Sequence, residues 1–196
     1  MKRTIALFTA IYLAFTALAQ TEYRLTPAAT TLTWTGRKVI GQHTGHIKAE
    51  SGSVQWGRDG MTGAEITIDM TSITVLDMDP ESTAELTSHL KSRDFFNVWQ
   101  YPRSSFRATR VEKIAGAAAG SPNYTITGDL SIKGISNPVS FPVLAIQDKQ
   151  GIRATGTLVF DRTQYGIKYR SGSVFDALGD KVIDDKVQID FNLRAQ

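Results

Sequence analysis

The stretch from Tyr124 to Val143, YTITGDLSIKGISNPVSFPV, decides the fold class of this chain. Over its first nine residues apolar or small side chains alternate with polar ones, and the alternation returns between Val139 and Val143. Antiparallel strands with one buried and one solvated face have this period of two. The turn-forming residues from Gly134 to Pro138 separate the two runs. The stretch therefore predicts two strands joined by a turn.

The same period of two recurs along most of the chain. Further runs lie at 31–36, 54–56, 64–70, 104–109, 154–160 and 187–193. Turn chemistry separates some of them at 57–60 and 148–151, and the stretch 115–122 is small and polar enough to be a loose hairpin loop. About eight strands at such spacings indicate an all-β fold, either an up-and-down barrel or a sandwich. No stretch resembles a linker between domains.

One helix is predicted from about residue 80 to residue 92. Asp79 can cap its first turn, Pro80 suits the first helical position, and Glu81 favours the positive end of the helix dipole. The helix leads into HLKSRDFFNVWQYPRSSF, residues 89–106, which holds the densest aromatic cluster of the chain. We expect this segment to cross one open end of the barrel, either as a simple cap that excludes water or as a lid over a ligand.

The inward faces of the predicted strands are apolar, and periodicity alone favours a packed core over a cavity. Four small residues at apolar-phase positions argue for the cavity: Gly36, Gly128, Ala154 and Gly156. In a closed barrel such positions bend strands or leave room for a ligand, and eight strands are wide enough to hold one small ligand.

The first nineteen residues have the pattern of a secretory signal peptide. Lys2 and Arg3 precede an uncharged apolar run from Ile5 to Leu18, and Ala17-Leu18-Ala19 is a small-x-small cleavage site. Their removal lowers the basic residues from 22 to 20 against 19 acidic ones, a net charge of +1. Such a surface offers no electrostatic footprint for nucleic acid. We expect no stable membrane insertion, because this run is shorter than a span needs and no later one is long enough.

Residues with reactive or metal-binding side chains do not form a convincing set. The chain has no Cys, and His43 and His46, three apart in an extended segment, point to opposite faces. His89 belongs to the helix. Asp184 and Asp185 are adjacent, so they also face opposite sides of a strand. No phosphate-binding glycine loop or nucleophile elbow occurs. We therefore predict no catalytic residues, no metal site and no cofactor.

Cationic and aromatic side chains near strand ends allow two interpretations. Arg162 can form a salt bridge with Asp161 or Asp176, or its guanidinium can meet a phosphate oxygen. Arg37 and Lys38, at the end of the first strand, carry the same ambiguity. Tyr165 and Tyr169 flank Gly166 in a predicted loop, where they either border the barrel mouth or simply pack.

Several of these segments together resemble the YceI-like family. The motifs are LTWTGRKVIGQHTGHI, ITIDMTSITVLD, HLKSRDFFNVWQYPRSSF, ITGDLSIKGISNPVSFPV, FDRTQYGIKYRSGS and LGDKVIDDKVQIDFNL, in the family's order and across the mature chain. The resemblance implies a single domain over residues 20–196 with a lipocalin-like antiparallel barrel. It also implies polyisoprenoid binding, with a long apolar chain in the barrel and a polar headgroup at one mouth. Trp34 to Lys38, WTGRK, resembles one subgroup of the family.

The resulting hypothesis is an exported, non-enzymatic periplasmic protein that holds a long-chain isoprenoid or acyl lipid for transport, storage or sequestration. The barrel lining and lid are predicted to comprise Trp34, Phe95, Phe96, Trp99, Phe106, Ile126, Phe141, Phe160, Tyr165 and Tyr169. Arg162 and Lys38 are the predicted headgroup residues, with Arg37 beside Lys38. A structural or stress-protective barrel without lipid is the alternative, and an exported enzyme the third possibility. The sequence leaves the oligomeric state, a dimer included, open.

Overall fold

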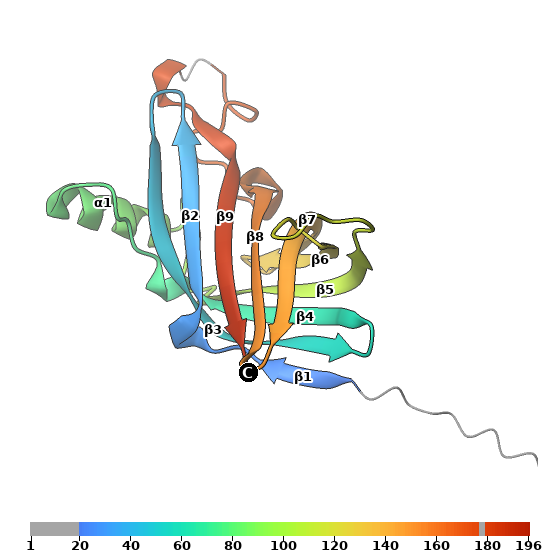
Figure 1. Cartoon of the computed structure of the whole chain (residues 1–196). Helices are drawn as coiled ribbons and strands as arrows, with labels where there is room; N and C mark the ends of the chain where they lie inside the picture. Colours follow the sequence, from blue (N-terminus) through green and yellow to red (C-terminus); the bar gives the residue numbers. More distant parts are fainter. Residues whose placement is uncertain (1–19, 177–178) are drawn as a thin grey trace, which may run out of the picture.

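The computed structural model describes residues 20–176 and 179–196 and consists mostly of strands (Figure 1). The strands are β1 Thr21–Arg24, β2 Thr31–Lys38, β3 Gln42–Gly57, β4 Gly60–Asp69, β5 Arg103–Lys113, β6 Tyr124–Ile132, β7 Ile135–Asp148, β8 Gly151–Asp161 and β9 Ile183–Ala195. The one α-helix of this part of the chain is α1, Pro80–Lys91. Four 3-10 turns complete it: η1 Pro27–Ala29, η2 Met70–Ser72, η3 Arg162–Tyr165 and η4 Gly179–Lys181. The predicted signal peptide lies outside the described residues.

Eight antiparallel strands close into a barrel in the order β3-β2-β9-β8-β7-β6-β5-β4, and β4 pairs back onto β3. The length of β3 makes this closure possible. Its first part pairs with β2, from Gln42 to Ile47, and its second part pairs with β4, from Lys48 to Gly57. β1 adds to β3 outside the ring. The predicted barrel is confirmed, and a two-sheet sandwich is excluded.

β3 is longer than the sequence predicted. The alternation revealed only its last part, after Ser51-Gly52, whereas the strand runs from Gln42 to Gly57. The strand instead bends there without ending, because its register with β4 shifts between Ala49 and Ser51. Gly52 permits the bend: a Cβ at this position would lie 2.5 Å from the carbonyl oxygen of Glu65. β1, four residues long, is the second strand that the sequence analysis missed.

The hairpin of the opening stretch is confirmed, but its turn lies earlier than predicted. Lys133 and Gly134 both have positive φ, 52° and 74°, as a two-residue type I′ turn requires. β7 begins directly afterwards at Ile135, so Pro138 lies within a strand and pairs with Asp129. β7 pairs with β8 only from Val143 onward, so Pro138 meets no second neighbour that would need its missing N–H.

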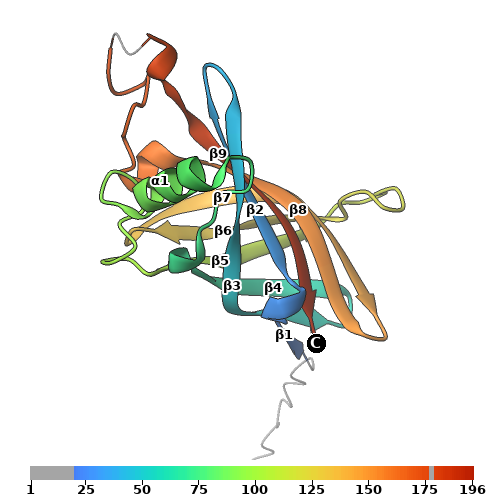
Figure 2. The same ribbon diagram turned by 90° about the vertical axis from the view of Figure 1, so that its left-hand side faces the viewer.

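Strand alternation places four connections at one end of the barrel, which we call the α1 end. They are the β2–β3 hairpin, the segment between β4 and β5 that contains α1, the β6–β7 turn, and the segment from η3 to β9. Figure 2 shows α1 outside this end. As predicted, Asp79 caps α1, accepting from the backbone N–H groups of Glu81 and Ser82 at 3.1 Å. Leu90 is its one buried residue.

Across residues 20–176 and 179–196, no helix reaches the length and hydropathy needed to cross a bilayer.

Candidate ligand cavity

The barrel encloses a cavity of about 230 Å³ lined mainly by apolar side chains that alternate inward along the strands. Its volume far exceeds the ~15 Å³ that one water needs. Periodicity alone favoured a packed core, and the cavity shows instead that the barrel is hollow. Seven of the ten predicted lining residues border it: Trp34, Phe95, Phe96, Phe106, Ile126, Phe141 and Phe160.

The WTGRK motif places Trp34 against the wall of this cavity. Trp34 pairs with Gly45 across β2 and β3, and a Cβ on Gly45 would lie 2.6 Å from the indole Nε1. The indole therefore needs a glycine at position 45. Its Nε1 donates to the carbonyl oxygen of Thr74 at 3.0 Å. The polar atom of this large aromatic ring is thereby satisfied, and Trp34 also lines the cavity.

Two of the four small residues do not provide the room that the sequence predicted. A Cβ on Gly128 would lie 2.5 Å from Cζ of Phe106, and one on Gly156 would lie 2.6 Å from Cζ of Phe191. These glycines accommodate neighbouring aromatic rings, which pack with Phe141 at centroid distances of 5.3 and 5.8 Å. Gly36 and Ala154, by contrast, do line the cavity.

The aromatic segment after α1 folds back beneath the helix. Phe96 N–H donates to the carbonyl oxygen of Leu90 and Val98 N–H to that of Lys91, both at 3.1 Å. Phe95 is buried and Phe96 half-buried, and both reach the cavity. The prediction for Trp99 is wrong. Asn97 turns the chain with φ 46°, and the Trp99 side chain is 93% exposed.

The two tyrosines around Gly166 pack behind the lining and do not border the cavity. Tyr165 is fully buried, with its ring edge-on to Phe160 at 5.6 Å, and burial raises the pKa of its hydroxyl. Tyr169 lies 5.4 Å from Phe95 and 4.7 Å from His89, measured between ring centroids. The geometry therefore supports a packing role for both tyrosines and not a position at the barrel mouth.

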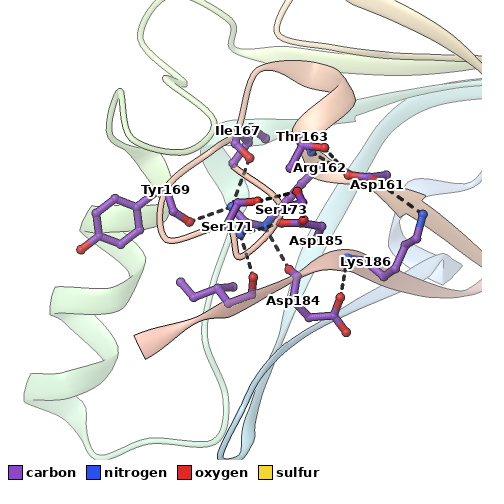
Figure 3. A network of polar contacts seen from close by, with 11 residues as sticks. Asp161, Arg162, Thr163, Ile167, Tyr169, Ser171, Ser173, Asp184, Asp185 and Lys186 are labelled. Atoms are coloured by element: carbon purple, nitrogen blue, oxygen red, sulfur yellow. Dashed lines mark hydrogen bonds and ion pairs between the residues drawn. The ribbon is translucent and has the colours of Figure 1, made fainter. Parts of the chain in front are cut away.

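Arg162 is a structural residue (Figure 3). Its side chain is buried, and its five N–H donors all point at protein oxygens. They donate to the carbonyl oxygens of Asp184, Ile167, Tyr169 and Ile183, and to Oδ1 of Asp185 at 3.2 Å. No donor remains for a phosphate, so the headgroup prediction for Arg162 is wrong. The salt-bridge alternative is correct in kind, with Asp185 as the partner.

The Arg162 network ties the segment after η3 to the start of β9. Burial lowers the pKa of Arg162, while the charges of Asp185, Asp161 and Asp184 oppose that shift. Asp185 also accepts from Ser173, so both of its carboxylate oxygens are occupied. Asp161 caps η3 through Thr163 and accepts from Lys186 Nζ at 3.4 Å. The network fixes the wall of the α1 end next to the cavity.

Other charged residues border the cavity where it meets solvent at the α1 end. Arg37 and Lys38 on β2 and Asp184 on β9 are exposed and also line the cavity. Among residues 20–176 and 179–196, the side chain of Arg37 hydrogen-bonds only to Gln188, 3.3 Å from Nη2 to Oε1. Arg37 and Lys38, the alternative headgroup residues of the sequence analysis, therefore lie at a mouth.

The three histidines lie in three different environments. His43 lines the cavity, with Nδ1 3.5 Å from Oδ2 of Asp77, whereas His46 is exposed on the other face of β3. His89, on α1, meets Oδ2 of Asp94 through Nε2 at 3.0 Å. Within the described ranges, no three His, Asp or Glu side chains gather as a metal site would require.

A closed antiparallel barrel of eight strands with a hollow apolar interior is the architecture of lipocalin-like proteins. A model of the YceI-like domain matches residues 23–195. The chain belongs to the YceI-like family. Among curated relatives, a UPF0312 protein of Shewanella sp. (strain ANA-3) is 28% identical over 134 residues, 65% of either chain. The match thus spans just under two thirds of that relative.

Solved structures show the same fold. BcnA of Burkholderia cenocepacia has a TM-score of 0.67 at 24% identity, and the similarity covers 86% of this chain and 98% of BcnA. A polyisoprenoid binding domain from Saccharophagus degradans, described as implicated in plant cell wall breakdown, has a TM-score of 0.57 at 16% identity, covering 87% and 95%. The YceI protein of Campylobacter jejuni has a TM-score of 0.52 at 15% identity, covering 98% and 93%.

Proposed function

We propose that this protein is a non-enzymatic carrier that holds the apolar chain of a long isoprenoid or acyl lipid inside its barrel. The observation that carries the proposal is the apolar cavity of about 230 Å³, bordered by Arg37 and Lys38 where it meets solvent. One end of such a site suits a hydrocarbon chain and the other an anionic or polar headgroup. The YceI-like family and its polyisoprenoid-binding neighbour support the same ligand class.

The energetics favour a ligand of this kind. At about 24 cal/mol for each Å³, an unfilled apolar cavity of about 230 Å³ costs the fold about 5.5 kcal/mol. Each methylene that leaves water contributes ~0.8 kcal/mol, so ten buried carbons contribute about 8 kcal/mol before the cost of ordering the chain. A barrel filled with lipid is therefore expected to be more stable than the same barrel without it.

We place the headgroup at Lys38 and Arg37, because Arg162 has no free donor. The test compares farnesyl phosphate with farnesol, using displacement of N-phenyl-1-naphthylamine fluorescence from the protein. Replacing both Arg37 and Lys38 by Ala should weaken the binding of farnesyl phosphate about tenfold more than the binding of farnesol, which corresponds to about 1.4 kcal/mol. Equal losses for both probes would remove the headgroup role from these residues.

The carrier itself is tested by filling the cavity. Ala154 on β8 is buried and lines the cavity, whereas its neighbour Thr155 lies on the other face of the strand. Ala154→Phe should abolish dye and farnesol binding, and Thr155→Phe should leave both intact. Circular dichroism shows whether each variant keeps the strand-rich fold. A folded Ala154→Phe protein that still binds both probes with unchanged affinity would place the binding site outside the barrel.

Export to the periplasm belongs to this proposal. It rests on the basic start, the uncharged run from Ile5 to Leu18 and the site Ala17-Leu18-Ala19. N-terminal sequencing of the exported protein should begin at Gln20. Uncleaved protein recovered with the inner membrane would contradict cleavage.

A further inference from the structure

One buried hydroxyl, that of Ser104, lies on the cavity wall. Ser104 lies near the start of β5, two residues before Phe106 on the same inward face, and it is 5% exposed. Its residue lines the cavity. Within residues 20–176 and 179–196, its Oγ has no hydrogen-bond partner. Burying a hydroxyl without a hydrogen bond is energetically unfavourable. We therefore expect the Ser104 hydroxyl to find a hydrogen-bond partner inside the cavity.

The surroundings of Ser104 are apolar. Its antiparallel partner on β4 is Ile68, and both Ile68 and Phe106 line the same cavity. An ordered buried water requires two to four polar partners, and these neighbours supply none from their side chains. An oxygen carried by a ligand that is itself held by the cavity would satisfy the hydroxyl without needing further polar partners.

We propose that Ser104 Oγ hydrogen-bonds a neutral oxygen of the bound lipid inside the barrel, and so selects oxygen-bearing chains over pure hydrocarbons. The inference rests on the proposed carrier function and specifies its ligand class. The oxygen must be neutral, as in a hydroxyl, carbonyl or ester, because an ionised group in this apolar wall would lose its hydration for a single hydrogen bond. A charged headgroup instead belongs at Arg37 and Lys38.

A second serine provides a matched control. Ser53 on β3 is also buried, at 6% exposure, and also lines the cavity. Its Oγ already accepts a hydrogen bond from Nε2 of Gln55 at 2.8 Å. Ser53 is therefore a buried, cavity-lining serine whose hydroxyl is already paired within the protein, whereas the hydroxyl of Ser104 has no partner among the described residues.

The experiment measures the binding affinities of 1-decanol and n-decane by displacement of N-phenyl-1-naphthylamine from the mature protein. Ser104→Ala should weaken the binding of 1-decanol by about 3- to 10-fold, the effect of one neutral hydrogen bond, and leave the affinity for n-decane unchanged. Ser104→Thr, which keeps a hydroxyl, should retain the preference for the alcohol. Ser53→Ala should change neither probe.

An unchanged ratio of 1-decanol to n-decane affinity in Ser104→Ala would overturn the role of Ser104 while leaving the carrier function intact. An equal loss of the alcohol preference in Ser53→Ala would also overturn it, because the effect would then follow cavity polarity in general. If neither probe displaces the dye from the wild-type protein, the carrier function fails and the inference fails with it.

Discussion

Arg162 donates from Nη2 to Oδ1 of Asp185 at 3.2 Å, and its other four donors all meet backbone carbonyl oxygens. A cation on the wall of the apolar cavity thus serves the fold. Because it joins η3, the following segment and the start of β9, its effects should appear in stability and not in headgroup selectivity.

We expect Arg162→Ala to destabilise the protein by about 3–5 kcal/mol, because it leaves a carboxylate and several carbonyl oxygens without their donor. Arg162→Lys should recover only part of this loss, since an ammonium cannot reproduce the planar fork. Urea denaturation gives the free energies of unfolding. Arg110→Ala is the control, because Arg110 pairs with Glu112 on the exposed surface and its loss should leave the midpoint nearly unchanged.

A small effect of Arg162→Ala on stability, combined with a selective loss of farnesyl phosphate over farnesol, would contradict this assignment. It would return Arg162 to the headgroup site that its sequence context first suggested.

The aromatic segment should divide into a buried and an exposed part. Phe95→Ala should cost about 3–5 kcal/mol, since its ring is buried against Tyr169 and the cavity. Trp99→Ala should change the stability by less than about 0.5 kcal/mol. Iodide should quench a Trp fluorescence component that disappears in Trp99→Phe, because Trp34 and Trp56 are half-buried. Protection of Trp99 from iodide in the free monomer would show that the side chain packs elsewhere.

Strand glycines that are covered by an aromatic ring should not tolerate substitution by Ala. Gly128→Ala is expected to cost about 1–3 kcal/mol, because its Cβ would lie 2.4 Å from the carbonyl oxygen of Arg107 and 2.5 Å from Phe106 Cζ. At Gly36 the nearest atom to an added Cβ is Cζ3 of Trp34 at 3.9 Å, so Gly36→Ala should be nearly neutral. Thermal denaturation compares the two, and equal melting temperatures would contradict the packing described for Gly128.

Lowering the pH should destabilise the fold at the α1 end, because Asp161 becomes protonated. Burial opposes the shift, but hydrogen bonds from Thr163 and the charge of Lys186 lower the pKa of Asp161 below its usual value. A carboxyl whose pKa is lower in the folded state stabilises the fold above its unfolded pKa of about 3.9 and loses that contribution as pH falls through the folded value. Melting temperatures from pH 7 to pH 3 should therefore fall less steeply for Asp161→Asn than for the wild type. Parallel curves for the two proteins would contradict the linkage.

Period-two alternation was sufficient to predict an all-β fold of about eight strands, the inward faces and the hairpin of the opening stretch, but it did not separate a barrel from a sandwich. It identified Trp34, Phe106 and Phe160 as lining, because their direction follows from position in a strand. It missed the first part of β3, where polar residues such as Gln42 and Thr44 conceal the alternation. Ile47 and Ala49, which alternate with Lys48 and Glu50, were the available signal.

The residues of the α1 end were less predictable, because loop geometry decides their direction. Trp99 points outward owing to one left-handed residue at Asn97, and nothing in the local sequence separates it from Phe95. Arg162 looks free in sequence because four of its five acceptors are backbone oxygens, which no side-chain pattern reveals. Ser104 shares the inward phase of Phe106, so alternation did predict its direction, but not its unpaired hydroxyl.

The lipid content of the mature protein, purified without detergent from its native host, tests the central claim most directly. Native mass spectrometry should show the chain with one added mass of a long-chain lipid, organic extraction should release that lipid, and Ala154→Phe should lack it. Bare protein in both preparations, together with no binding of added prenyl or acyl lipids, would contradict the carrier function and favour a barrel with a purely structural role.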